Sequence, residues 1–160
     1  MNHLEQIIGE FLDWRGFVVK RNVKVGRRGM GGWEMELDIV AYHPSQNRLV
    51  HVEASLDAHS WTKREQRYLK KFTLGDKYIR TEVFTWLPAG TAIERLAIFP
   101  STAGRTELAG ASLQSVDDFM REVKAAICAG KVMAKDAIPE QYPLLRTLQL
   151  ALVGYHRVAG

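Results

Sequence analysis

The spacing of apolar residues in the first hundred positions predicts helices and strands in a mixed order. At the start of the chain, apolar residues recur every three or four positions, which is the period of a helix, and Gly16 ends this run. Three stretches rich in β-branched and aromatic residues follow, separated by a basic glycine-rich loop and by a turn. We expect these stretches to form strands at residues 17–25, 33–42 and 48–55.

A second long helix and a fourth strand are expected next. Ser60 is a good N-cap for a helix that begins near Trp61, and Gly75 is a candidate break within that helix. Residues 95–99 have the composition of a short apolar strand. This order predicts an α/β fold in which a three-stranded meander, a crossover helix and a further strand build a mixed sheet flanked by helices.

The last part of the chain, residues 101–160, is expected to be a helical C-terminal extension. An apolar stripe begins at Val116, and Pro143 suits the first turn of a final helix. That final helix is apolar around much of its girth, so we expect it to be buried either in the core or in a homodimer contact. Since no repeat or low-complexity linker interrupts the chain, we expect one domain over residues 1–160, with a core at 1–100.

Bulk composition excludes several classes of protein. A chain of 160 residues suits one domain with one sizeable core. Cys128 is the single cysteine, which excludes an internal disulfide and a cysteine-rich zinc site. No apolar run approaches the roughly 20 residues that span a bilayer, and the first residues lack the pattern of a secretory signal. We therefore expect a cytoplasmic protein with no membrane partner.

Positive charge is concentrated in two parts of the chain, although the net charge is only +4. The clusters hold half of the 22 lysines and arginines and few acids: Arg15, Lys20, Arg21, Lys24, Arg27, Arg28, and then Lys63, Arg64, Arg67, Lys70, Lys71. Such concentration is typical of a protein that binds a polyanion such as nucleic acid. The alternative interpretation is a solvated helix face together with an ordinary edge strand.

Two acids, Asp38 and Glu53, each lie in an otherwise apolar strand. A carboxylate in a half-buried strand is costly unless a cation or hydrogen bonds compensate it. If the two strands are neighbours, the two side chains converge and repel each other unless one is protonated or a cation bridges them. Oxygen ligands of this kind suit Mg²⁺ or Mn²⁺, which polarises a phosphate and generates hydroxide from bound water.

In these residues and their order the chain resembles the PD-(D/E)xK, or restriction-endonuclease-like, nuclease superfamily. Within it the chain looks most like the Holliday-junction-resolvase-like and methyl-directed restriction endonuclease members. The family has an α-β-β-β-α-β core, and residues 3–99 are predicted to have that order. The family's helix-one glutamate matches Glu5, ahead of the Gly16–Phe17 pair, and its two strand acids match Asp38 and Glu53.

The resemblance implies metal-dependent hydrolysis of phosphodiester bonds in DNA. It implies that Mg²⁺ or Mn²⁺ is held by Asp38, Glu53 and Glu5, and that Gln66, early in the second helix, matches a glutamine of the family site. Many resolvase-like members are homodimers, so a homodimer is expected here as well. The side chains expected to contact the nucleic-acid backbone are Arg21, Lys24, Arg27, Arg28 and Lys71.

The chain departs from the family pattern at its catalytic lysine, where Ser55 stands instead. Serine carries no charge to stabilise a developing negative charge. Some family members carry this lysine on the following helix, where Lys63 and Lys70 share the helix face of Gln66 and are the candidates here. Three functions stay open: an active nuclease, a nuclease-fold module that binds nucleic acid without cleaving it, and a protein-binding module that uses the apolar C-terminal helix.

Overall fold

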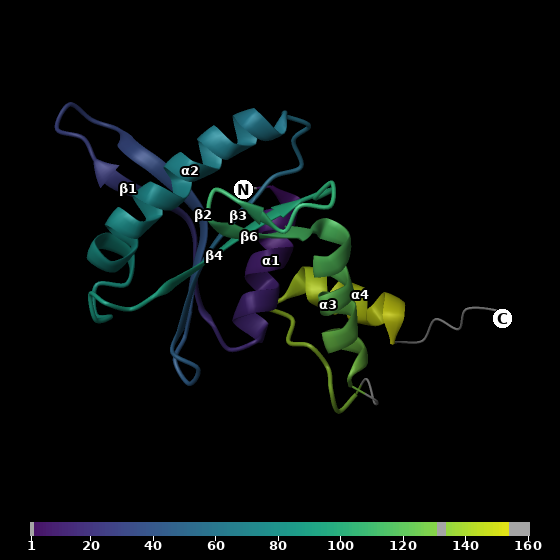
Figure 1. Cartoon of the computed structure of the whole chain (residues 1–160). Coiled ribbons are helices and arrows are strands. Elements are labelled where there is room, and N and C mark those ends of the chain that lie inside the picture. Colours follow the sequence, from purple (N-terminus) through teal and green to yellow (C-terminus); the bar gives the residue numbers. More distant parts are fainter. Residues whose placement is uncertain (1, 131–133, 154–160) are drawn as a thin grey trace. The chain divides into compact units, whose positions relative to one another are not determined.

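The computed structural model describes residues 2–130 and 134–153, and Figure 1 traces its elements along the chain. The elements in order are α1 (His3–Trp14), β1 (Val18–Arg27), β2 (Trp33–His43), β3 (Arg48–Ala54), α2 (Trp61–Tyr78), a π-helical turn η1 (Ile79–Val83), β4 (Ile93–Phe99), β5 (Glu107–Leu108), β6 (Ala111–Ser115), α3 (Val116–Cys128) and α4 (Pro143–Leu152). The chain divides into two compact units, one up to residue 116 and one from residue 117.

The first unit is built on a six-stranded mixed sheet in the order β1-β2-β3-β4-β6-β5. The first three strands form an antiparallel meander, as the turn-separated apolar stretches predict. β4 then pairs with β3 in parallel, which requires the crossover that α2 provides. The prediction of an α/β fold with a mixed sheet flanked by helices is confirmed, and β5 and β6 add two strands that the sequence did not indicate.

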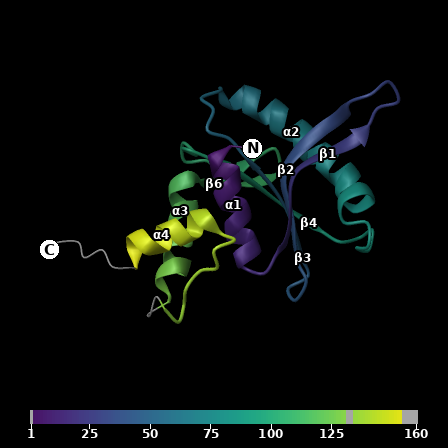
Figure 2. The ribbon, with the colours of Figure 1, turned by 180° about the vertical axis from the view of Figure 1, so that it is seen from behind.

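Helices α1 and α2 cover opposite faces of this sheet. The Arg21 side chain, paired in register with Ile39, lies against Gly9 of α1. The next residue along β2, Val40, pairs with His51, whose ring lies against Gly75 of α2. Because successive side chains of a strand point to opposite faces, the two helices lie on opposite sides, as the two views in Figures 1 and 2 also show.

The ladder between β1 and β2 is interrupted where the candidate aspartate lies. Arg21 pairs with Ile39 and Val23 pairs with Leu37, but Asn22 and Asp38 between them form no such pair. Asn22 has a φ of +51°, a left-handed conformation that asparagine tolerates better than most residues. On its other side Asp38 lies just beyond the last β2–β3 pair, Ile39↔Val52, and its backbone N–H bonds the Glu53 side chain.

Two apolar clusters on the α2 side of the sheet hold the second helix in place. One gathers buried residues of β1, β2 and β3 with Ile79 and Phe84, and the other joins Tyr68 and Phe72 of α2 to β4, β5 and β6. Gly75 lies within α2 and does not break it, so the expectation of a break there is wrong. Its lack of a side chain serves the contact with β3 instead, because a Cβ atom at Gly75 would stand only 2.4 Å from His51 Nδ1.

The second unit contains α3 and α4, near the positions expected for the two C-terminal helices. α4 begins with Pro143 at its first turn, as predicted. Leu145 and Gln149 are buried, and the Gln149 side chain accepts a hydrogen bond from Ile138 N–H at 2.8 Å. Leu150 and Leu152 of the same helix are exposed. Within residues 2–130 and 134–153, none of the helices combines the length and the apolar character needed to cross a bilayer.

Candidate functional site

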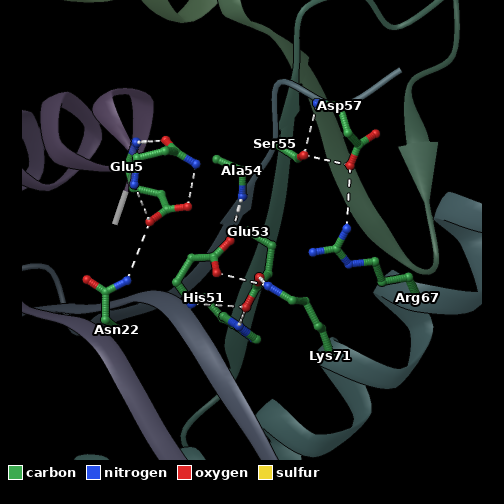
Figure 3. A network of polar contacts seen from close by, with 11 residues as sticks. Glu5, Asn22, His51, Glu53, Ala54, Ser55, Asp57, Arg67 and Lys71 are labelled. Carbon is green, nitrogen blue, oxygen red and sulfur yellow. Dashed lines mark hydrogen bonds and ion pairs between the residues drawn. The ribbon is translucent and has the colours of Figure 1, made fainter. Parts of the chain in front are cut away.

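Asp38 and Glu53 converge on the α2 side of the sheet, and a lysine of α2 lies between them. The β2–β3 register pairs Ile39 with Val52, so Asp38 and Glu53 are the next facing positions as the two strands separate. Lys71 Nζ donates a hydrogen bond of 2.9 Å to Asp38 Oδ1 and a second one to Glu53 Oε2. Figure 3 shows the Lys71 side chain reaching from α2 to the strand that carries Glu53.

Every oxygen of the two carboxylates has a hydrogen-bond donor. Beyond the two bonds from Lys71, Asp38 Oδ2 accepts from the Ala54 backbone N–H at 3.1 Å. Glu53 Oε1 accepts from the Asp38 backbone N–H at 3.3 Å and from His51 Nε2 at 2.7 Å. The Asp38 backbone N–H, just beyond the end of the β2–β3 pairing, is therefore part of the site. Two carboxylates that would repel each other are compensated by one ammonium group and by fixed N–H groups.

The site is largely enclosed, and two of its three charged groups keep a small exposed surface. The side chain of Glu53 is fully buried, whereas those of Lys71 and Asp38 keep 9% and 13% of their surface exposed. Burial and the adjacent Glu53 charge raise the pKa of Asp38 to about 6. Burial also raises the pKa of Glu53, an effect that the charge of Lys71 only partly offsets. An acid with a pKa near neutrality, in a buried charge cluster, is typical of functional sites.

Lys71 keeps its proton although it is buried. Burial acts to lower the pKa of this ammonium, but the attraction of Glu53 and then of Asp38 outweighs it, so the pKa lies above the ordinary value. Lys71 therefore acts as a permanent positive charge in the site at neutral pH. Removing it would leave two acids in a poorly solvated place with no counter-charge.

His51 is a neutral ring that forms a hydrogen bond with the Glu53 carboxylate. Burial, and then the charge of Lys71, lower the pKa of His51 to about 3. The neutral ring donates from Nε2 to Glu53, while its Nδ1 is buried without a hydrogen-bond partner in the described part of the chain. The ring packs edge-on against Phe72, with centroids 5.0 Å apart. Because packing fixes the position of the His51 ring, the hydrogen bond from the ring fixes the orientation of the Glu53 carboxylate.

Ser55, the residue expected to replace a catalytic lysine, forms its side-chain contacts with Asp57 in the loop that follows β3. Its Oγ donates to Asp57 Oδ2 at 2.6 Å and accepts from the Asp57 backbone N–H at 3.1 Å. Asp57 in turn bonds Arg64 Nε at 3.3 Å and lies 3.5 Å from an Arg67 nitrogen. Figure 3 shows Ser55 and Arg67 on the Asp57 side of the network. Ser55 thus orders the loop between β3 and α2.

Glu5, the expected third metal ligand, is engaged at the start of α1. It forms a capping box with Asn2, in which the Asn2 backbone N–H donates to Glu5 Oε2 at 3.2 Å. Asn22 Nδ2 also lies 3.4 Å from Glu5 Oε2. In Figure 3 the Glu5 carboxylate points from α1 toward the strand that carries Ala54 and Glu53. Among residues 2–130 and 134–153, its side chain has polar contacts with the two asparagines and with neither strand acid.

The other candidates on α2 lie away from the acid pair. Gln66 and Lys70 are exposed, and both line a hollow together with Arg28. Lys63 is exposed in the first turn, where its backbone N–H donates to the N-cap Ser60 at 3.4 Å. None of these three side chains has a described contact with Asp38 or Glu53 in the ranges 2–130 and 134–153. The lysine that the structure brings to the acids is Lys71, which the sequence interpretation had grouped with the backbone-contacting cations.

The basic residues of β1 have different environments. Lys24 and Arg27 are exposed on the strand, and Arg28 is exposed at the start of the loop that follows it. Arg21 is half-buried and its side chain lies against α1. A Cβ atom at Gly9 of this helix would lie only 2.1 Å from Arg21 Nε. Arg21 Nε is buried without a hydrogen-bond partner in the described part of the chain. Arg21 is thus a packing residue between β1 and α1, while the other three cations are open to a partner.

The position of Lys71 in the site has a sequence signal that was overlooked. The face of α2 that packs on the sheet contains Arg64, Tyr68, Lys71 and Gly75, which recur at three and four positions. A lysine on the inward face of a helix needs a buried partner, because an unpaired ammonium is costly there. With two strand acids as the available partners, this periodicity favours Lys71 over Lys63 and Lys70.

The carboxylate oxygens of Asp38 and Glu53 suit a hard divalent cation but supply only part of its coordination shell. Asp38 and Glu53 offer carboxylate oxygens that already converge on one cationic group, which is the arrangement a divalent ion would use. Over the described ranges 2–130 and 134–153, no three His, Cys, Asp or Glu side chains are grouped closely enough to hold a metal. A cation bound by the acid pair would therefore complete its shell with backbone carbonyls, water or substrate oxygens, as Mg²⁺ does in many phosphate-processing sites.

Comparison with protein families and with curated proteins finds no match. Among solved structures the chain is similar to a crystal structure described as a protein of unknown function, AF1548. The two chains are 13% identical, the match covers 94% of this chain and 98% of that one, and the TM-score is 0.40.

Proposed function

We propose that this protein is a restriction-endonuclease-like nuclease that hydrolyses phosphodiester bonds in DNA at the Asp38–Glu53–Lys71 site. The observation that carries the proposal is the ammonium group of Lys71 between two acids from neighbouring strands. The order of α1, β1 to β3, α2 and β4 supports it as well, because this is the α-β-β-β-α-β order of that superfamily. Lys71 supplies, from the following helix, the positive charge that Ser55 lacks.

In this proposal each residue of the chain has a separate role. Lys71 donates hydrogen bonds to a phosphate oxygen or to the attacking water and stabilises the negative charge that develops there. Asp38, whose pKa is near 6, is the acid that gains or loses a proton near neutral pH. His51 and the Asp38 backbone N–H hold Glu53 in one orientation. The bound phosphodiester is thereby oriented against fixed groups.

Asp38 and Glu53 would hold a Mg²⁺ or Mn²⁺ ion in this proposal, with Glu5 as a further ligand if its capping box opens. Such an ion supplies Lewis-acid polarisation of the phosphate. The residues of the chain bind and orient the substrate around it. Lys71 shares both acids, so its ammonium must shift from at least one of them for the ion to bind.

The test is cleavage of labelled branched, single-stranded and duplex DNA in the presence of Mg²⁺ or Mn²⁺. We expect cleavage by the native protein and a loss of at least about a hundredfold in Asp38→Asn, Glu53→Gln and Lys71→Met, since each removes a group that acts on the transition state. Lys70→Gln is the matched control, and its kcat should equal that of the native protein. Absence of any cleavage that depends on these three residues would sink the proposal.

A second candidate function is a nucleic-acid-binding module with the same fold and no chemistry. The observation in its favour is that all four carboxylate oxygens already have donors, so the acid pair is compensated without a metal. It predicts salt-sensitive DNA binding that Asp38→Asn leaves intact, together with no cleavage under any metal condition. The cleavage and binding assays together separate the two candidates.

A further inference from the structure

A hollow of about 480 Å³ lies between the β1–β2 hairpin and the outer side of α2. Arg28 and Glu34 line it from the hairpin, while Gln66, Leu69, Lys70 and Thr73 line it from the helix. The hairpin and α2 run beside each other in both views of the fold, Figures 1 and 2. The residues that the sequence pattern assigned to catalysis, Gln66 and Lys70, thus share a hollow with a residue assigned to backbone binding.

The charges around the hollow favour an anionic occupant. The guanidinium of Arg28 and the ammonium of Lys70 form no hydrogen bond or ion pair within residues 2–130 and 134–153. Glu34, the acid among the described lining residues, lies 3.6 Å from Lys77 Nζ and is compensated by it. Arg28 and Lys70 thus line the same hollow without a described counter-charge. This arrangement is expected at a site that binds phosphate groups.

Polar residues on one side of α2 extend this surface along the helix. Lys63, Gln66, Lys70 and Thr73 recur at three and four positions and lie along one side of α2. Leu69 is 55% exposed beside them, an apolar surface suited to a sugar or a base. A hollow of this volume has the size of a small-molecule site, so it admits a nucleotide unit of one strand rather than a duplex.

We propose that this hollow binds a single nucleic-acid strand, with Arg28 and Lys70 on its phosphates and Gln66 and Leu69 on its sugars or bases. This inference rests on the proposed function, because it names the path by which a substrate strand is held. It gives Gln66 and Lys70 a role in binding. Lys71, the neighbour of Lys70 in sequence, belongs to the acid pair on the inner side of the same helix.

The test measures binding of a fluorescein-labelled twelve-nucleotide oligothymidine by anisotropy at several salt concentrations, in EDTA so that no cleavage occurs. Arg28→Gln combined with Lys70→Gln should weaken binding about tenfold or more and lower the slope of log affinity against log salt by about 1.4, for two lost phosphate contacts. The matched control is Lys124→Gln with Lys135→Gln, which removes the same charge from exposed positions outside the hollow. It should change the affinity less than about threefold.

A third variant tests the sign of the charge effect. Glu34→Gln removes the acid from the wall of the hollow and should tighten binding of the same oligonucleotide. Equal losses in the two double variants would overturn the inference, because they would indicate attraction by net charge alone. If the native protein binds the strand through the hollow but cleaves no DNA, the proposed hydrolysis is wrong and strand binding in the hollow is supported. If Arg28→Gln with Lys70→Gln cleaves DNA with the native KM, strand binding in the hollow is wrong and the proposed hydrolysis is supported.

Discussion

Lys71 Nζ lies 2.9 Å from Asp38 Oδ1, a contact between residues 33 positions apart in the chain. Asp38 comes from β2 and Lys71 from the inward face of α2, so the contact exists only because α2 packs on the sheet. The same ammonium bonds Glu53. It joins the two strand acids into one buried charge cluster.

Removing the ammonium should destabilise the fold strongly. Lys71→Met leaves two carboxylates buried with no counter-charge, and breaking such a pair typically costs about 3–5 kcal/mol. We expect the free energy of unfolding, measured by urea denaturation in EDTA at pH 7.5, to fall by that amount. Lys70→Met is the control on the outer side of the helix and should change it by less than about 0.5 kcal/mol. A similar small change in both variants would mean that Lys71 does not compensate the acids.

The stability contributed by Asp38 should depend on pH with a definite sign. Its pKa is raised from 3.8 to about 6, so the folded state favours the protonated acid. This contribution is fully present below about pH 4 and is lost as the pH rises through 6. Relative to the native protein, Asp38→Asn should therefore gain on the order of 3 kcal/mol of unfolding free energy between pH 4 and pH 8.

The measurement is a series of denaturant titrations of both proteins from pH 4 to pH 8. Glu36→Gln, an exposed acid two positions earlier on the same strand, serves as the control. The gain of Asp38→Asn over this range should exceed that of Glu36→Gln. A constant difference between Asp38→Asn and the native protein would show that the Asp38 carboxylate is not perturbed.

The hydrogen bond from His51 to Glu53 should be worth about 1–3 kcal/mol, because its loss leaves a buried carboxylate oxygen with one donor fewer. We expect His51→Leu to lower the free energy of unfolding by this amount at pH 7.5, and His51→Gln, which keeps a donor, to lower it less. With the pKa of His51 lowered to about 3, the native protein loses stability as the pH falls below about 6.5. The deficit of His51→Leu should then shrink toward pH 4, and a deficit that grows would contradict the assignment of a neutral ring.

A methyl group at Gly75 should disturb the site through His51. Alanine favours a helix over glycine by about 1 kcal/mol, but its Cβ would stand 2.4 Å from a ring that is 1% exposed and cannot move freely. Overpacking of this kind costs about 1–3 kcal/mol, so we expect Gly75→Ala to be net destabilising in thermal and urea unfolding. Gly90→Ala, where a Cβ would meet nothing within 4 Å, is the control and should be nearly neutral. An increase in stability for Gly75→Ala would show that β3 and α2 approach less closely.

Local patterns in the sequence were sufficient for the order of the main elements. Alternating and helical periodicities predicted α1, the three-stranded meander, α2 and β4, because each pattern reflects burial of one face of one element. The strands β5 and β6 and the π-helical turn η1 were not predicted. All three are short, and their conformation depends on the neighbours they pack against more than on their own residues.

The sequence by itself determined that Asp38 and Glu53 lie in apolar strands and that a serine, Ser55, lies two positions after Glu53. Only the tertiary structure decided which lysine meets the acids. Lys70 and Lys71 are adjacent in sequence, yet one lines the outer hollow and the other bonds Asp38. The physical reason is the rotation of about 100° between successive residues of a helix: which residue faces the sheet depends on how α2 docks, and that is settled by packing across the whole sheet.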